Sequence, residues 1–161
     1  MVLAVVIGSI FVSGCTSNTE YTSETTEKDS HPSTTSLDPN DDEMWISLMK
    51  TTLISQGIDV DSIKVANGRD KGGNKVVIVA YVSHAYDEKG VVGEIGSVVG
   101  AFLGAKMKGW DIDELIGVIG DTNGQAVGTW YCDKEWAEMY IRGELSMEEL
   151  GMKVVQTIEK I

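Results

Sequence analysis

The residues best suited to chemistry lie in one short segment that follows an apolar run. His84 stands two positions before Tyr86, and Asp87 and Glu88 directly follow Tyr86. A histidine can act as a general base near neutral pH, and a nearby carboxylate can orient its ring. His84 and Asp87 are therefore the candidate catalytic pair, and they would suit a small hydrolase. The alternative interpretation is a polar loop with a surface histidine. It is supported by the lack of an accompanying nucleophile or second histidine for His84 in the region after residue 40.

Three aspartates form a second candidate site, this time for a metal ion. Asp111 and Asp113 alternate with Ile112, so both carboxylates can face one side, and Asp121 follows seven residues after Glu114. Calcium takes six to eight oxygen ligands, which such a group could begin to supply. The turn around Asp121 also needs polar residues for its own backbone. The sequence has no phosphate-binding glycine loop with lysine, no H-E-x-x-H and no paired zinc cysteines, so we expect no cofactor.

Aromatic residues give a third candidate site, for a ligand or a protein partner. Trp110, Trp130 and Trp136 lie in the C-terminal third of the chain. In an extended strand Trp130 shares a face with Gly128, which would leave a shallow hollow beside the indole ring. Rigid aromatics beside such a gap suit binding, and they equally suit packing in a core.

Hydrophobic periodicity and turn residues predict the elements that must position these side chains. The helices are expected at about 42–56, 87–108, 133–143 and 146–161, and the strands at 62–66, 75–83, 114–120 and 125–132. Asn123-Gly124 predicts a tight hairpin, and Ser146 with Glu149 fits a capping box. This order predicts an α+β two-layer sandwich: a four-stranded antiparallel sheet of two hairpins, with helices on one face.

Two apolar segments carry further expectations. Residues 76–82 are apolar at nearly every position, so both faces of that strand should be covered. In the helix at 87–108, Gly96, Gly100 and Gly104 recur every four residues. Such a row lets another backbone approach closely, either the sheet below or a second copy of the chain. A large side chain at Gly100 is therefore expected to disrupt the packing.

The N-terminus predicts where the protein works. An apolar run of about eleven residues is too short to span a bilayer and has the length of a signal-peptide core. It ends in Val12-Ser13-Gly14-Cys15 and resembles the lipobox of exported lipoproteins, although no Lys or Arg precedes it. The resemblance implies that 1–15 is a signal peptide with lipidated Cys15. It also implies a protein anchored to the outer face of the cytoplasmic membrane, or to an outer membrane where one exists.

Composition divides the rest of the chain in two. Residues 16–40 contain 12 Ser or Thr among 25 residues and both prolines, which predicts a disordered tether. Residues 41–161 suffice for a single domain with one core. The formal net charge of the chain is −12, and a charge of that sign repels nucleic acid. With Cys15 lipidated, Cys132 has no partner for a disulfide and is expected to be a small buried residue.

In element order alone, the two successive hairpin-plus-helix units are similar to the secretion-chaperone-like α+β folds, an adaptor architecture that binds other proteins. The resemblance contains no motif. We therefore expect a lipid-anchored, non-catalytic binding or adaptor module for a protein or a small ligand. The expected partners are the membrane, through Cys15, and a protein or a second copy of the chain. The alternative is a small envelope hydrolase that uses His84 and Asp87.

Overall fold

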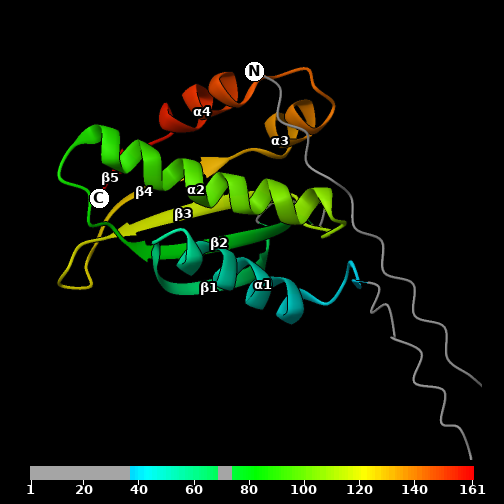
Figure 1. The fold of residues 1–161 in the computed structure, drawn as a ribbon, viewed down its shortest axis with the longest axis horizontal. Helices are drawn as coiled ribbons and strands as arrows, with labels where there is room; N and C mark the ends of the chain where they lie inside the picture. The colour runs from blue at the N-terminus through cyan, green and yellow to red at the C-terminus, as the bar shows by residue number, and fades with distance from the viewer. Residues whose placement is uncertain (1–36, 69–73) are drawn as a thin grey trace, which may run out of the picture. The chain divides into compact units, whose positions relative to one another are not determined.

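The computed structural model describes residues 37–68 and 74–161, so the predicted signal peptide and most of the predicted tether lie outside the described residues. The described part is an α+β structure (Figure 1). Its helices and strands follow in the order α1 (Asp42–Ser55), β1 (Asp59–Asn67), β2 (Lys75–Val82), α2 (Glu88–Met107), β3 (Glu114–Gly120), β4 (Ala126–Cys132), α3 (Lys134–Ile141), α4 (Met147–Val155) and β5 (Glu159–Lys160).

Side-chain caps fix where the helices begin. Asp41, Asp87 and Asp133 each accept a hydrogen bond from a backbone N–H in the first turn of the helix that follows. Ser146 and Glu149 form the reciprocal capping box at the start of α4, as predicted. The predicted hairpin at Asn123-Gly124 is also confirmed, with Gly124 at a φ of 78° that a β-carbon would disfavour.

The sheet is mixed, which corrects the prediction of four antiparallel strands. Its strand order is β1-β2-β3-β4-β5, and β2 runs parallel to β3 while the other neighbouring pairs are antiparallel. The cause is α2, whose 20 residues extend about 30 Å and return the chain to the end of the sheet where β2 began. The β1–β2 hairpin and the β3–β4 hairpin therefore lie side by side, and the parallel pairing of β2 with β3 joins them.

The predicted last helix is too long. Helix α4 ends at Val155, and β5 then pairs with β4, with Glu159 opposite Thr129. Thr157 lies at the change of direction, where its hydroxyl accepts a hydrogen bond from the Tyr131 N–H at 2.9 Å. Pairing with an open strand edge thus outweighs the helical spacing of Leu150, Val154 and Ile158.

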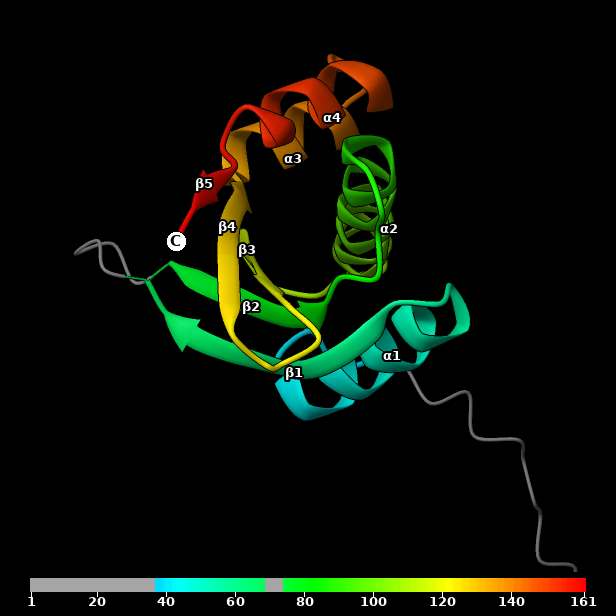
Figure 2. The ribbon, with the colours of Figure 1, turned by 90° about the vertical axis from the view of Figure 1, so that its left-hand side faces the viewer.

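One core lies between the helices and the inner face of the sheet. Figure 2 shows α2, α3 and α4 on the same side of β3 and β4, with α1 alongside β1. Side chains from all four helices enter one cluster of buried residues, with Trp45, Phe102, Ala137 and Leu150 among them. Helix α2 is long and apolar enough to cross a membrane, but much of its apolar surface lies in this core, as is common for a core helix.

The row formed by Gly96, Gly100 and Gly104 on α2 does not pack on the sheet, which was one of the two expected partners. A β-carbon built on Gly96, Gly100 or Gly104 meets no atom within 4 Å outside the neighbouring helix backbone. The core side of α2 consists instead of residues such as Val98 and Phe102. The expectation that the sheet packs closely on this row is therefore corrected, whereas the effect of a large side chain at half-buried Gly100 stays a prediction.

Candidate functional site

The outer face of the sheet, the face away from α2, carries apolar side chains on the neighbouring strands β2 and β3. The outward positions are Val76, Ile78, Ala80 and Val82 on β2 and Ile116 and Val118 on β3. Strand register arranges the face in cross-strand rows, one of which runs Lys64, Ile78, Ile116, Tyr131. The next row is Ser62, Ala80, Val118, Thr129, Glu159. An apolar centre thus has polar residues on both sides.

A hollow of ≈ 610 Å³ lies over this face. Val76, Ile78 and Ile116 contribute to its floor, and Tyr131 stands beside them with 42 % of its surface exposed. Residues 66–68 and 74, at the end of the β1–β2 hairpin, line one side, and Thr157 and Glu159 line the other. Every lining residue belongs to a strand or to a segment next to one. Among the described residues, no helix covers the hollow, and this corrects the expectation that both faces of β2 are covered.

The described lining of the hollow carries negative charge. Among its described lining residues, the charged ones are Glu114 and Glu159. Lys64 stands at the β1 end of the same row as Ile78, Ile116 and Tyr131; it is exposed and lies outside the lining of the hollow. The face therefore combines an apolar floor with carboxylates on the side of β3 to β5.

A buried hydrogen bond stiffens the sheet beneath the floor. The Trp130 Nε1–H on β4 donates to the Tyr81 hydroxyl on β2 at 3.2 Å, across the intervening strand β3. Burial raises the pKa of Tyr81 to about 12, and the charge of Glu94 adds to that rise against the effect of the Trp130 hydrogen bond. The Trp130 ring lies over Gly117, where a β-carbon would overlap its Cε2, Cζ2 and Nε1 atoms.

The candidate catalytic residues are near each other in sequence but have different partners. His84 Nε2 lies 3.0 Å from Asp59 Oδ2 on β1, and both side chains are 59 % exposed. The carboxylate of Asp87 accepts the Gly90 N–H and caps α2. The His84 N–H donates to Glu94 Oε1, while the other carboxylate oxygen of Glu94 is buried without a hydrogen-bond partner among the described residues. Asp59 thus occupies the orienting position that sequence analysis gave to Asp87.

The candidate metal ligands are separated by a whole strand. Asp111 and Asp113 precede β3, whereas Asp121 follows it, about 20 Å away for a seven-residue strand. Asp121 accepts hydrogen bonds from the N–H groups of Asn123 and Gln125 and thereby closes its turn. In the described ranges, no group of three or more His, Cys, Asp or Glu side chains is placed to hold a metal ion.

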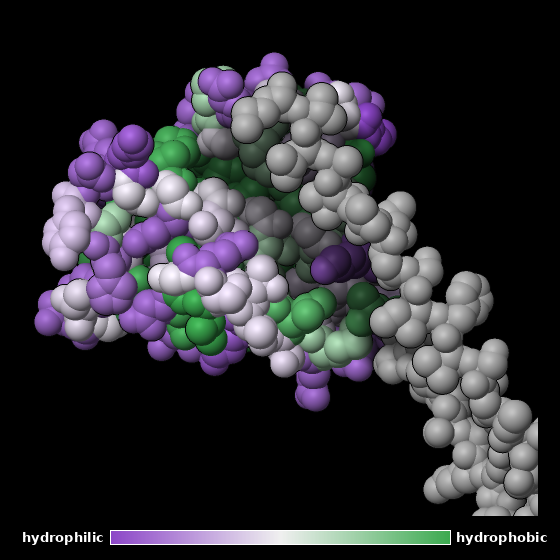
Figure 3. Space-filling view, viewed as in Figure 1, coloured by the Kyte–Doolittle hydropathy of each residue, from purple (hydrophilic) through white to green (hydrophobic). Residues whose placement is uncertain are grey.

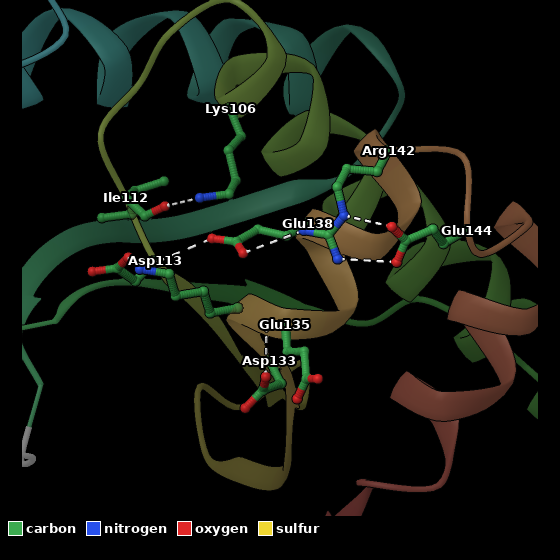
Figure 4. Close-up of polar contacts among 9 residues, drawn as sticks. Lys106, Ile112, Asp113, Asp133, Glu135, Glu138, Arg142 and Glu144 are labelled. Carbon is green, nitrogen blue, oxygen red and sulfur yellow. Dashed lines mark hydrogen bonds and ion pairs between the residues drawn. The ribbon is translucent and has the colours of Figure 1, made fainter.

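Asp113 instead joins three elements of the fold. Its carboxylate accepts the Lys75 N–H at the start of β2, at 3.0 Å, and pairs with Lys134 of α3 at 2.5 Å. Figure 4 shows Asp113 among further surface contacts, including the two hydrogen bonds between Arg142 and Glu144. Lys106 donates to the Ile112 carbonyl next to Asp113. The cluster is structural, since its contacts tie the segment before β3 to β2, α2 and α3.

The aromatic candidates fall in three separate places. Trp110 is buried and stacks on Trp45 with ring centroids 6.1 Å apart, and its Nε1–H donates to Asp42. Trp130 is 1 % exposed, and its ring fills the space over Gly117. Gly128 lies close to the Glu159 carbonyl, 3.3 Å from where a β-carbon would stand. Trp136 is half-buried, stacks on Tyr131 at 5.8 Å and lies beneath the Lys153 ammonium.

Cys132 is a buried free thiol at the end of β4. Burial raises the pKa of Cys132 to about 12, and the charges of Asp133 and Glu114 act in the same direction. The thiol therefore stays protonated at neutral pH and contributes as a small core residue.

A family model described as a domain of unknown function (DUF8159) matches residues 39–161. The chain belongs to the DUF8159 family. No curated protein and no solved structure matches the chain. The match includes every helix and strand of the structure, so the outer face of the sheet lies wholly within the DUF8159 domain.

The DUF8159 domain has another apolar hollow on its helix-bearing side. In Figure 3 hydrophobic side chains show in the furrow between α2 and α4. Val92, Gly151, Met152 and Val155 line a space of ≈ 480 Å³ there, and Met152 is 55 % exposed. The sheet face differs from this furrow in one respect: its outward apolar positions lie on two neighbouring strands, and one of these, β2, was expected to be covered on both faces.

Sequence analysis did not select the outer face of the DUF8159 domain as a site. The signal for it was present in residues 76–82, whose outward positions are as apolar as the inward ones. What the sequence could not supply was the register that brings Ile116 and Tyr131 beside Ile78.

Proposed function

We propose that this chain is a lipid-anchored, non-catalytic binding module of the cell envelope, which docks a partner protein on the outer face of its sheet. The observation that supports docking is the apolar character of that face. A sheet with one face in water normally alternates apolar inward and polar outward side chains. Here the outward side chains of β2 and β3 include the half-buried Ile78, Ile116 and Val118 beside the buried Val76. Apolar side chains that line an open hollow are typical of an interaction site.

The proposed anchor is the lipid on Cys15, and the proposed tether is 16–40. A flexible chain of 25 residues has a root-mean-square span of roughly 25 to 30 Å. This length would hold the domain clear of the lipid headgroups and let it sample nearby partners at a raised local concentration. The net charge of −12 supports this arrangement, because it keeps the domain away from anionic lipid surfaces.

Replacing Cys15 by alanine is expected to abolish membrane attachment, because the thiol is the atom that lipidation would modify. Metabolic labelling with a fatty-acid analogue, followed by fractionation of membranes, measures both lipidation and location. Replacing Ser13 by alanine serves as the control, since a small residue at that position preserves the lipobox pattern. A Cys15→Ala variant that is still labelled and still sediments with membranes would contradict the proposed anchor.

A photo-crosslinking phenylalanine analogue at Tyr131 is expected to yield a discrete protein adduct in intact cells. Tyr131 lines the hollow and is 42 % exposed, so a docked partner would lie within reach of its ring. The matched control places the same analogue at Tyr86, an aromatic residue that is fully exposed but outside the hollow. Denaturing electrophoresis and mass spectrometry detect the adduct.

The adduct should also depend on the apolar floor. Combining the analogue at Tyr131 with Ile116→Thr keeps a β-branched residue in β3 but adds a hydroxyl to the floor. We expect the yield to drop at least fivefold. Equal adducts from positions 131 and 86, or a yield that Ile116→Thr leaves unchanged, would overturn docking on this face.

The hydrolase alternative gains no support from the geometry around His84. Its side chain pairs with exposed Asp59, Asp87 is used as a helix cap, and no Ser, Thr or Cys side chain of the described ranges bonds to the imidazole.

A further inference from the structure

We infer that the occupant of the outer face is a basic amphipathic helix of a partner protein, an inference that rests on the proposed docking function and adds the chemistry of the partner. The first support is size. The walls of the hollow lie on β1 and β5, four strand spacings apart, which is about 19 Å. An α-helix with its side chains is about 10 to 12 Å across, so one helix fits on the floor between the walls.

The second support is the sign of the charge. The charged residues that line the hollow within the described ranges are Glu114 and Glu159, and both lie on the side of β3 to β5. The whole chain carries a net charge of −12. A helix with an apolar face and flanking Lys or Arg side chains would place a cation beside the Glu159 carboxylate, which steers association and fixes orientation.

The same two observations disfavour a second copy as the occupant. Two hollows placed face to face would leave a void between their floors, whereas stable interfaces pack as densely as protein interiors. Two chains of net charge −12 also repel each other over the Debye length, and single Lys64–Glu159 contacts at the rim would offset little of that repulsion.

The test uses the full chain in phosphatidylcholine nanodiscs and three fluorescent helical peptides of 16 residues. The peptides share one leucine-rich face and differ only in their flanks, which carry lysine, glutamine or glutamate. Fluorescence anisotropy, with empty nanodiscs subtracted, gives the three dissociation constants. We expect the lysine peptide to bind at least tenfold more tightly than the glutamate peptide, with the glutamine peptide between them, and the difference to shrink at high salt.

Charge reversal at the rim locates the effect. Glu159→Lys is expected to reduce the preference for the lysine peptide to within twofold, because it places a cation at the wall of the hollow. Glu43→Lys makes the same charge change at an exposed position of α1, outside the lining of the hollow, and should leave the order of affinities unchanged. If both variants lost the preference for the lysine peptide equally, the preference would come from the net charge of the chain, and a local site at the hollow would be overturned.

The outcomes separate this inference from the proposed function. If all three peptides bind equally and this binding is lost in Ile116→Thr and in Tyr131→Ser, the basic character of the partner is overturned, whereas docking on the apolar face is supported. Binding that both variants leave unchanged would overturn the docking face itself. A dimer by sedimentation of the full chain, dispersed by Ile116→Thr, would identify a second copy as the occupant and overturn the helix. Circular dichroism confirms that each variant is folded before its affinity is compared.

Discussion

Gly117→Ala is expected to destabilise the domain by about 3 kcal/mol or more, toward the upper end of what overpacking costs. The new β-carbon would overlap the indole ring of Trp130, which faces Gly117 across the β3–β4 ladder. The ring cannot move aside at low cost, because it is 1 % exposed and its Nε1–H is bonded to the buried Tyr81 hydroxyl. Thermal unfolding should show the midpoint lowered by roughly 10 °C for a domain of this size.

Two companion variants make this prediction specific. Gly120→Ala changes a glycine at the end of the same strand, where a β-carbon would meet its nearest atom, the Tyr81 carbonyl oxygen, at 3.5 Å. That variant should stay within about 0.5 kcal/mol of the wild type. Trp130→Leu removes the ring, so Gly117→Ala should cost at least 1 kcal/mol less in that background. Additive effects of the two substitutions would contradict the steric explanation.

The parts of the fold that sequence analysis predicted are those that local chemistry determines. Asp133 and Ser146 accept backbone N–H groups within three residues of themselves, and Asn123-Gly124 closes a turn between adjacent strands. These signals need no knowledge of the rest of the chain, because donor and acceptor are neighbours in sequence.

The parts that could not be predicted depend on contacts between distant residues. The parallel pairing of β2 with β3 follows from the length of α2, and β5 forms because β4 leaves an edge open beside Thr157. The same holds for the site. The partner of His84 is Asp59, 25 residues earlier, which the β1–β2 register brings to the end of β2. Trp130 is buried over Gly117 rather than beside a hollow at Gly128, because the packing partner lies on the next strand.

The docking face shows a further limit of single-sequence reasoning. The apolar run at 76–82 indicated correctly that two faces would be apolar, but the covering layer was assumed to come from the chain itself. Among the described residues, the helices all contribute to the inner core, so the outer layer is not supplied by this part of the chain. A run of this type therefore predicts either a central buried strand or an interaction surface.

Asp113→Ala is expected to destabilise the domain by about 1 to 3 kcal/mol at pH 7, because the Lys75 N–H loses its acceptor and Lys134 loses its ion pair. Asp111→Ala is the matched control: Asp111 is exposed, two residues away, and its described hydrogen bond uses only its backbone N–H. Urea unfolding of the two variants and the wild type gives the free energies. Equal losses in both variants would contradict a specific role for Asp113.

The same contacts make this contribution pH-dependent. Partial burial acts to raise the pKa of Asp113, but hydrogen bonds from Lys134 and the Lys75 N–H outweigh burial, with help from the charges of Lys134 and Lys106, so the pKa lies below its ordinary value. A carboxyl whose pKa is lower in the folded state stabilises that state above its unfolded pKa of about 4. The stabilisation is lost as the pH falls through the folded pKa. The difference in unfolding free energy between wild type and Asp113→Ala should therefore be constant from pH 5 to 7 and shrink steadily below pH 4, whereas a difference independent of pH would show that the charge of Asp113 contributes nothing.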